Sequence, residues 1–165
     1  MFTHLHVHTD YSLLDGVSRI KPMITKAKSL GMDSLAITDH GNMHGAIEFY
    51  LTAKEMGIKP ILGCEIYVAP RSRYDKTSLD KTPYHLTVLA KDIEGYKNLC
   101  KLITKSHLEG FYYKPRVDKA ILQEHSEGLV VLSGCLNAEI PKLITQNRLD
   151  EAKNAALWYK EIFND

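Results

Sequence analysis

The sequence contains few cysteines, no long apolar run and no signal-peptide pattern. Its 165 residues include three cysteines, an odd and sparse set that argues against a disulfide framework and for a reducing compartment. The aliphatic runs, such as Leu129–Leu132, are far too short to span a bilayer. The first residues have neither the basic nor the apolar region of a signal peptide. We therefore expect a cytoplasmic protein without membrane contact.

The sequence also lacks an excess of charge of either sign. It has 21 Lys and Arg against 20 Asp and Glu, which leaves a net charge of +1. This balance excludes a strongly basic nucleic-acid coat and a polybasic membrane anchor, although it permits a local basic surface. Histidine is unusually abundant: there are eight, and three of them lie within the first eight residues.

Short apolar runs alternate with helical patterns along the whole chain. We expect strands at Phe2–Val7, Ser34–Thr38, Lys59–Val68, Tyr84–Ala90 and Leu129–Ser133. We expect helices at residues 20–30, 46–56, 93–106 and 118–124, and two more between Ala138 and Asn164 that separate near Asn147. The polar segment 71–82 is typical of a solvated loop. This order predicts a single α/β domain over residues 1–165 with a mainly parallel sheet, either a barrel or doubly wound.

Residues that can bind metal stand at the carboxyl ends of these strands, where α/β proteins place their chemistry. His6 and His8 alternate with His4, so a strand would direct all three imidazoles to one side. His40 ends the second strand, and Cys135 follows the fifth. From the residues alone, hydrogen-bonded histidines and a small buried thiol are the simpler alternatives. The coincidence of these residues at several strand ends favours metal.

Glu65 is unusual because it lies inside an otherwise apolar strand. An unpaired buried carboxylate costs several kcal/mol, on the order of 3–5, so Glu65 needs a cationic partner. A metal ion is one such partner, and a buried Lys or Arg is the alternative. Imidazole, carboxylate and thiolate together suit Zn²⁺, with Mn²⁺ or Fe²⁺ possible, and the donors exceed the four that one zinc requires. We therefore predict two or three divalent ions in one cleft, a common arrangement for phosphate-ester hydrolysis.

Four motifs resemble those of the PHP (polymerase and histidinol phosphatase) domain family. They are His6-Val7-His8, Thr38-Asp39-His40-Gly41, Gly63-Cys64-Glu65 and Ser133-Gly134-Cys135. The stretches from His4 to Gly16 and from Gly110 to Arg116 resemble, more closely, the PHP domains in the N-terminal part of bacterial DNA polymerase III alpha subunits. The resemblance covers essentially the whole chain.

The resemblance implies a distorted β/α barrel with a cleft for three metal ions. The ligand positions of the family fall on His6, His8, Asp15, His40, Glu65, His107 and Cys135, with Glu65 as the bridging carboxylate. Without the resemblance, Asp15 would be interpreted as a turn aspartate and His107 as a helix C-terminal histidine. His85, at the start of the fourth strand, is interpreted as structural. The last Asp-x-His motif of the family has no counterpart after Cys135, so we expect a barrel that lacks its final strands and last metal-binding motif.

The expected function is that of a metal-dependent phosphoesterase module of a replicative polymerase, with 3′–5′ exonuclease activity through a metal-bound hydroxide. Its expected partners are DNA, the remainder of the alpha subunit and other replisome subunits. The alternatives are a small-molecule phosphatase of the histidinol-phosphate type and a non-catalytic scaffold. Phe111–Arg116 interleaves aromatic and basic residues, which is compatible with base stacking or with packing at a barrel rim.

Overall fold

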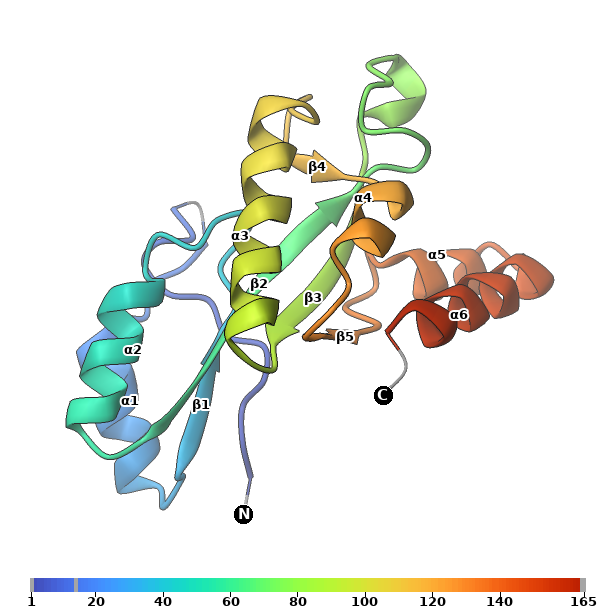
Figure 1. Ribbon diagram of the computed structural model, residues 1–165. Helices are drawn as coiled ribbons and strands as arrows, with labels where there is room; N and C mark the ends of the chain where they lie inside the picture. Colours follow the sequence, from blue (N-terminus) through green and yellow to red (C-terminus); the bar gives the residue numbers. More distant parts are fainter. Residues whose placement is uncertain (1, 14, 164–165) are drawn as a thin grey trace.

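The computed structural model describes residues 2–13 and 15–163. Its strands are β1 (Ser34–Ile37), β2 (Lys59–Val68), β3 (Tyr84–Ala90), β4 (Arg116–Val117) and β5 (Leu129–Leu132). Its helices are α1 (Ile20–Ser29), α2 (Ala46–Glu55), α3 (Ile93–Leu108), α4 (Lys119–Glu124), α5 (Glu139–Thr145) and α6 (Leu149–Ile162), with a 3₁₀ turn at Ser78–Asp80. Figure 1 shows the helices arranged around one central sheet. The α/β fold class is therefore confirmed.

The sheet is mixed, so the prediction of a mainly parallel sheet is wrong. The strand order is β1-β2-β3-β5, with β4 paired to β2. β2 is parallel to β1 and β4, whereas β3 is antiparallel to both β2 and β5. The segment between β2 and β3 contains only the 3₁₀ turn, whereas the crossover between parallel strands is usually an α-helix. The chain therefore turns back on itself, and the start of β3 comes to lie beside the carboxyl end of β2.

The predicted strand at Phe2–Val7 is not formed. Two main-chain hydrogen bonds tie this segment to β1: the amide of Ala36 donates to His4 at 3.0 Å, and the amide of Thr38 donates to Val7 at 2.8 Å. The bonds are two residues apart on β1 but three apart on the N-terminal segment. This unequal spacing resembles a bulge and interrupts a regular ladder.

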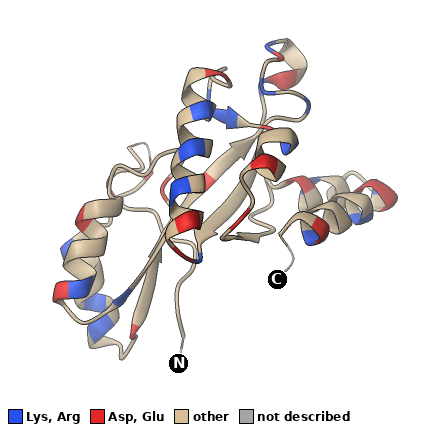
Figure 2. Cartoon of the chain, viewed as in Figure 1, with Lys and Arg blue, Asp and Glu red and all other residues tan. Residues whose placement is uncertain are grey.

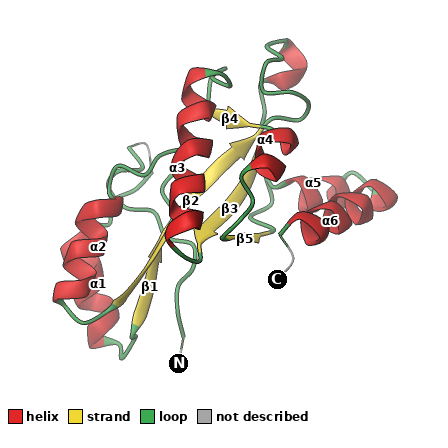
Figure 3. Ribbon diagram, in the orientation of Figure 1, coloured by secondary structure: helices red, strands yellow, loops and turns green. Residues whose placement is uncertain are grey.

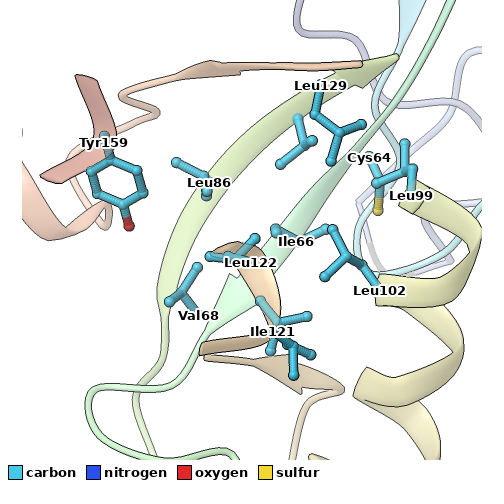
Figure 4. Packing of buried hydrophobic residues seen from close by; sticks show 12 residues of the cluster. Cys64, Ile66, Val68, Leu86, Leu99, Leu102, Ile121, Leu122, Leu129 and Tyr159 are labelled. Carbon is cyan, nitrogen blue, oxygen red and sulfur yellow. The ribbon is translucent and has the colours of Figure 1, made fainter. Parts of the chain in front are cut away.

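The main hydrophobic core lies between one face of β2 and β3 and the helices α3 and α4 (Figure 4). Cys64, Ile66 and Val68 point from β2 into this core, against Leu99 and Leu102 of α3. Because side chains alternate along a strand, residues 65 and 67 face the other side of the sheet. The prediction that Cys64 is buried on the face opposite Glu65 is confirmed.

A second cluster packs α1 and α2 against β1 and places the carboxyl end of β1 beside that of β2. Ile24, Ile37 and Phe49 are among its fully or almost fully buried members. Three residues after β1, His40 pairs with Glu65 of β2 in an isolated parallel β-bridge. Both side chains therefore emerge at the same edge of the sheet.

The predicted division of the C-terminal region near Asn147 is confirmed. Asn147 has a φ of 59° between α5 and α6, a left-handed conformation that asparagine tolerates better than most residues. Asn164 lies outside the described residues. Among the described residues, no helix is both long and apolar enough to cross a bilayer.

Most of segment 71–82 is exposed, as expected of a solvated loop, but the segment is also anchored to the fold at two buried residues. Arg73 and Asp80 are buried in it, and a capping box starts its 3₁₀ turn. Its anchor is Arg116 of β4, which is fully buried and donates to main-chain carbonyls of this segment. The two-residue β4 is too short to leave a periodic pattern and was not expected. Figure 3 shows the segment as a loop with one helical turn, which projects beyond β2.

Candidate metal centre

Glu65 is the centre of the candidate site. It lies on β2 directly opposite Thr87 of β3, and Tyr67 lies opposite His85. His85 is thus a diagonal neighbour of Glu65 on the same face of the antiparallel pair, within reach of its side chain. The carboxylate is 2% exposed and accepts hydrogen bonds at both oxygens. This burial makes Glu65 dependent on its histidine neighbours.

His6 and His8 approach the same carboxylate oxygen from the N-terminal segment. The Nε2 atom of His6 lies 2.5 Å from Oε2 of Glu65, and that of His8 lies 3.1 Å from it. These three residues form a group whose potential ligand atoms all lie within 4.8 Å of one another. The sequence predicted that His4, His6 and His8 point to one side. Among the described residues His6 and His8 join a candidate metal-binding group, and His4 joins neither group.

A second group combines Glu65 with His40 and His85. The Nδ1 atom of His85 contacts Oε1 of Glu65, and the Nδ1 atom of His40 lies 3.8 Å from Oε2. The His8 and His40 rings are stacked, with centroids 4.1 Å apart, which brings the two groups side by side. One carboxylate therefore stands between two sets of imidazoles.

The donor set fits divalent metal ions. The Nδ1 atom of His40 is buried and has no hydrogen-bond partner among the described residues, although it faces the carboxylate. A buried polar atom without a partner is rare and calls for an explanation such as an ion. Imidazole nitrogens around a shared carboxylate suit Zn²⁺, Mn²⁺ or Fe²⁺.

The electrostatics of the site show that the histidines stabilise the carboxylate. Burial by itself raises the pKa of Glu65, but hydrogen bonds from His8, His85 and His6 outweigh it and hold this pKa well below its usual range. In return, the hydrogen bond to Glu65 raises the pKa of His8 against the opposing effect of burial. The same sites that bind protons here are those that a metal ion would occupy.

Asp39 holds the loop that follows His8. Its buried carboxylate accepts hydrogen bonds from the amide and hydroxyl of Thr9, at 2.6 and 2.8 Å, and from the hydroxyl of Ser12 at 2.9 Å. Ser12 in turn lies 3.5 Å from Nδ1 of His8 and accepts from the amide of His40 at 3.1 Å. Asp39 therefore acts on the imidazoles through Ser12.

The other residues implied by the family resemblance surround the two groups. Oδ2 of Asp15 lies 2.9 Å from Nε2 of His40, at the exposed side of the site. His107 lies near the end of α3 and donates from Nε2 to the carbonyl of Gly41 at 3.0 Å. The sulfur of Cys135 lies 3.8 Å from Nδ1 of His85. The structure thus brings Asp15 next to His40 and Cys135 next to His85. His107 instead contacts the main chain of Gly41, the residue that follows His40.

His85 is the site residue that sequence reasoning missed, and its interpretation as structural is corrected. It stands at the start of a strand, whereas ligands were expected at the ends of strands in a mainly parallel sheet. In an antiparallel strand the start lies at the same edge as the neighbour's end. The available signal was the lack of a helical pattern between β2 and β3, because a parallel crossover usually contains a helix.

The site opens into a cleft of about 670 Å³. Asp15, His40, His85 and His107 line the cleft together with aromatic residues that include Tyr67 and Phe111. Burial, followed by the charge of Glu65, raises the pKa of Tyr67 to about 12, so its hydroxyl is neutral and can donate a hydrogen bond. The cleft can therefore hold an anionic group against the candidate metal centre.

Comparison with known proteins shows which family the chain belongs to. Residues 4–165 match the PHP domain family. The chain is 54% identical over 99% of its length to the DNA polymerase III subunit alpha of Borreliella burgdorferi, and 50% identical over 99% to that of Thermus aquaticus. It is also similar to a solved amidohydrolase from Chromobacterium violaceum, at 21% identity over 93% of this chain and 50% of that one, with a TM-score of 0.45.

The chain spans only a small part of the polymerase subunits that it matches, 14% of their length in both cases. The match to the family, in contrast, covers almost all of the chain and includes all the histidines and carboxylates of the candidate metal centre. The chain belongs to the PHP domain family.

Proposed function

We propose that this PHP domain is a metal-dependent phosphoesterase module of a DNA polymerase III alpha subunit, which removes nucleotides from the 3′ ends of DNA. The observation that carries the proposal is the convergence of four imidazoles on the single buried carboxylate of Glu65. Two or more metal ions that share a cleft are a common device for hydrolysing phosphate esters. The high identity to polymerase subunits supports DNA as the substrate. The proposed partners are the remainder of the alpha subunit and other replisome subunits, in the cytoplasm.

In this proposal His6, His8 and Glu65 hold one ion, and His40, Glu65 and His85 hold another. Asp15, His107 and Cys135 are proposed to complete the coordination. The bound ions, Zn²⁺, Mn²⁺ or Fe²⁺, would supply Lewis acidity and an activated water. Tyr67 donates a hydrogen bond from its neutral hydroxyl to a phosphoryl oxygen in the cleft. Ser12, held by Asp39, keeps the His8 ring oriented.

An exonuclease assay tests the proposal. With Mn²⁺ or Zn²⁺, the full chain is expected to release the terminal nucleotide from 3′-labelled single-stranded DNA. His8→Ala is expected to lower this rate by at least about 100-fold, because loss of a ligand costs at least as much as the 10–100-fold seen for outer partners. His4→Ala is the matched control, since His4 lies in the same segment but in neither candidate group; it is expected to keep the wild-type rate.

The assay also separates the alternatives. Hydrolysis of histidinol phosphate without attack on DNA would indicate a small-molecule phosphatase. Metal that raises the melting temperature without any hydrolysis would indicate a scaffold. Equal release of label by the wild type and His8→Ala would contradict a metal-dependent site at these residues.

Metal affinity is expected to fall as the pH falls. Because a protonated imidazole cannot bind metal, and the hydrogen bond to Glu65 raises the pKa of His8, protons compete for the site at a higher pH than they would for an ordinary imidazole. In the metal-free chain, the interaction of protonated His8 with Glu65 stabilises the fold at low pH, and this contribution is lost as the pH rises through the raised pKa of His8. Above this pKa the imidazole is neutral and able to bind metal. We expect Mn²⁺ to bind more tightly at pH ~8 than at pH ~6, by up to about tenfold per pH unit for each displaced proton. Calorimetric titration at both pH values measures this, and a pH-independent affinity would contradict it.

A further inference from the structure

A second pocket adjoins the candidate metal centre. It has a volume of about 370 Å³ and shares Tyr67, His85 and Lys114 with the larger cleft. Its further lining residues include Lys81 and Tyr113. Because His85 contacts Glu65, the pocket lies next to the candidate metal centre. It has room for a part of a substrate beyond the bond that is cleaved.

The pocket contains two lysines without carboxylate partners. Among the described residues, no salt bridge involves Lys81 or Lys114, whereas Arg71 and Arg73 of the same loop each pair with carboxylates. Figure 2 shows basic and acidic positions next to each other in this loop. The ammonium groups instead rest on tyrosine rings: that of Lys81 lies 5.6 Å from the centroid of Tyr113, and that of Lys114 lies 5.4 Å from that of Tyr67. Positive charge is therefore available to an anion in this pocket.

Tyr113 occupies a strained backbone position at the edge of the pocket. Its φ is 58°, a left-handed conformation that is unfavourable for a bulky side chain. Tyr113 is 63% exposed, so burial does not compensate for the strain. Strained residues of this kind concentrate at binding and catalytic sites.

Contacts of the neighbouring residues Tyr112 and Arg116 hold the turn that contains Tyr113. The amide of Tyr112 donates to the carbonyl of Lys114 at 3.0 Å and closes the turn. The buried guanidinium of Arg116 lies 5.2 Å from the centroid of the Tyr112 ring and donates to Gly110 at 3.0 Å. The backbone that carries Tyr113 is thus fixed by contacts within the protein.

We propose that Tyr113, Lys81 and Lys114 form a subsite for the nucleotide that adjoins the scissile phosphodiester. The Tyr113 ring stacks on the base, and the two lysines bind the phosphate. This inference rests on the proposed function and narrows its substrate to a strand of at least two nucleotides. Arg116, which the sequence pattern also offered as a phosphate ligand, is excluded because it is fully buried.

Binding of DNA in the absence of metal tests the subsite separately from catalysis. The probe is a short fluorescein-labelled oligo-dT, titrated with the full chain in EDTA and followed by fluorescence anisotropy. Tyr113→Ala and Lys81→Ala are each expected to weaken binding by about tenfold, in line with the effect of removing one stacking or phosphate contact. Lys76→Ala removes the same charge from an exposed position of the same loop outside the pocket, and is expected to bind as the wild type does.

Two further variants separate the ring from the fold. Tyr113→Gly relieves the left-handed strain while it removes the ring, so weak binding by this variant cannot be attributed to misfolding. Tyr113→Phe keeps the stacking surface and is expected to bind within about twofold of the wild type. Wild-type binding by Tyr113→Gly would overturn the subsite, even if the chain degrades DNA. A chain that degrades no DNA but loses binding in Tyr113→Gly would overturn the proposed function and leave the subsite supported.

Discussion

Replacement of Glu65 by glutamine is expected to abolish metal binding at both candidate positions at once. Glu65 belongs to both ligand groups, with Oε2 facing His6 and His8 and Oε1 facing His85. A neutral amide of the same shape offers one weak oxygen donor in place of two charged ones, so neither ion retains its shared ligand. Elemental analysis after dialysis is expected to find no bound divalent metal, and phosphodiesterase activity is expected to fall by more than about 100-fold.

Glu55→Gln provides the matched control for this variant. Glu55 is exposed near the end of α2, and its substitution changes the net charge of the chain by the same amount. It is expected to retain the metal content and activity of the wild type. Wild-type metal content in Glu65→Gln would show that the histidines hold ions without the carboxylate, and would contradict its shared role.

Replacement of Arg116 by alanine is expected to cause the largest loss of stability among the substitutions considered. The guanidinium is fully buried and donates to the carbonyls of Gly110, Asp80, Arg73 and Asp75 at 2.9–3.1 Å. Burial lowers the pKa of Arg116, but an arginine remains charged, so the charge is compensated here only by main-chain dipoles and nearby carboxylates. Alanine leaves these carbonyls without a donor and an apolar void in their place.

The expected cost is about 3 kcal/mol or more in the free energy of unfolding, measured by urea denaturation. Arg116→Lys is expected to recover only part of it, because an ammonium group cannot reach carbonyls on several sides as a planar guanidinium does. Arg148→Ala is the control: Arg148 pairs with Glu151 on an exposed surface, and its loss is expected to change stability little. Equal destabilisation by Arg116→Ala and Arg148→Ala would show that Arg116 does not anchor the loop.

Much of the fold follows from local patterns in the sequence. The bounds of β2 and β3 agree with prediction because each is a mainly apolar run that proline, glycine or charged residues delimit. The break at Asn147 also follows from its local signal. The direction of β3 could not be predicted from the strand itself, because strand direction depends on the connection rather than on the strand's own composition. The pairing geometry of the first segment, which prevents a regular strand at residues 2–7, is likewise a tertiary effect.

In the candidate site, too, residues with a local sequence signal could be predicted, and residues that depend on tertiary structure could not. His6, His8 and His40 could be predicted because they stand at the ends of predicted strands, and Glu65 because it is a carboxylate inside an otherwise apolar strand; the structure brings the four together. His85 depends on the direction of β3, so it was missed. Segment 71–82 is largely exposed, as its charge predicts, but the residue that anchors it, Arg116, lies more than thirty residues away in the sequence and could not be predicted locally.

The most direct test of the account is the location of metal in crystals of the chain grown with Zn²⁺. An anomalous difference map at the zinc edge should show one ion at coordination distance, about 2.0–2.2 Å, from Glu65 together with His6 and His8, and a second at that distance from Glu65 together with His40 and His85. Zinc bound elsewhere, with none at coordination distance from Glu65, would contradict the assignment of this cluster as the metal centre.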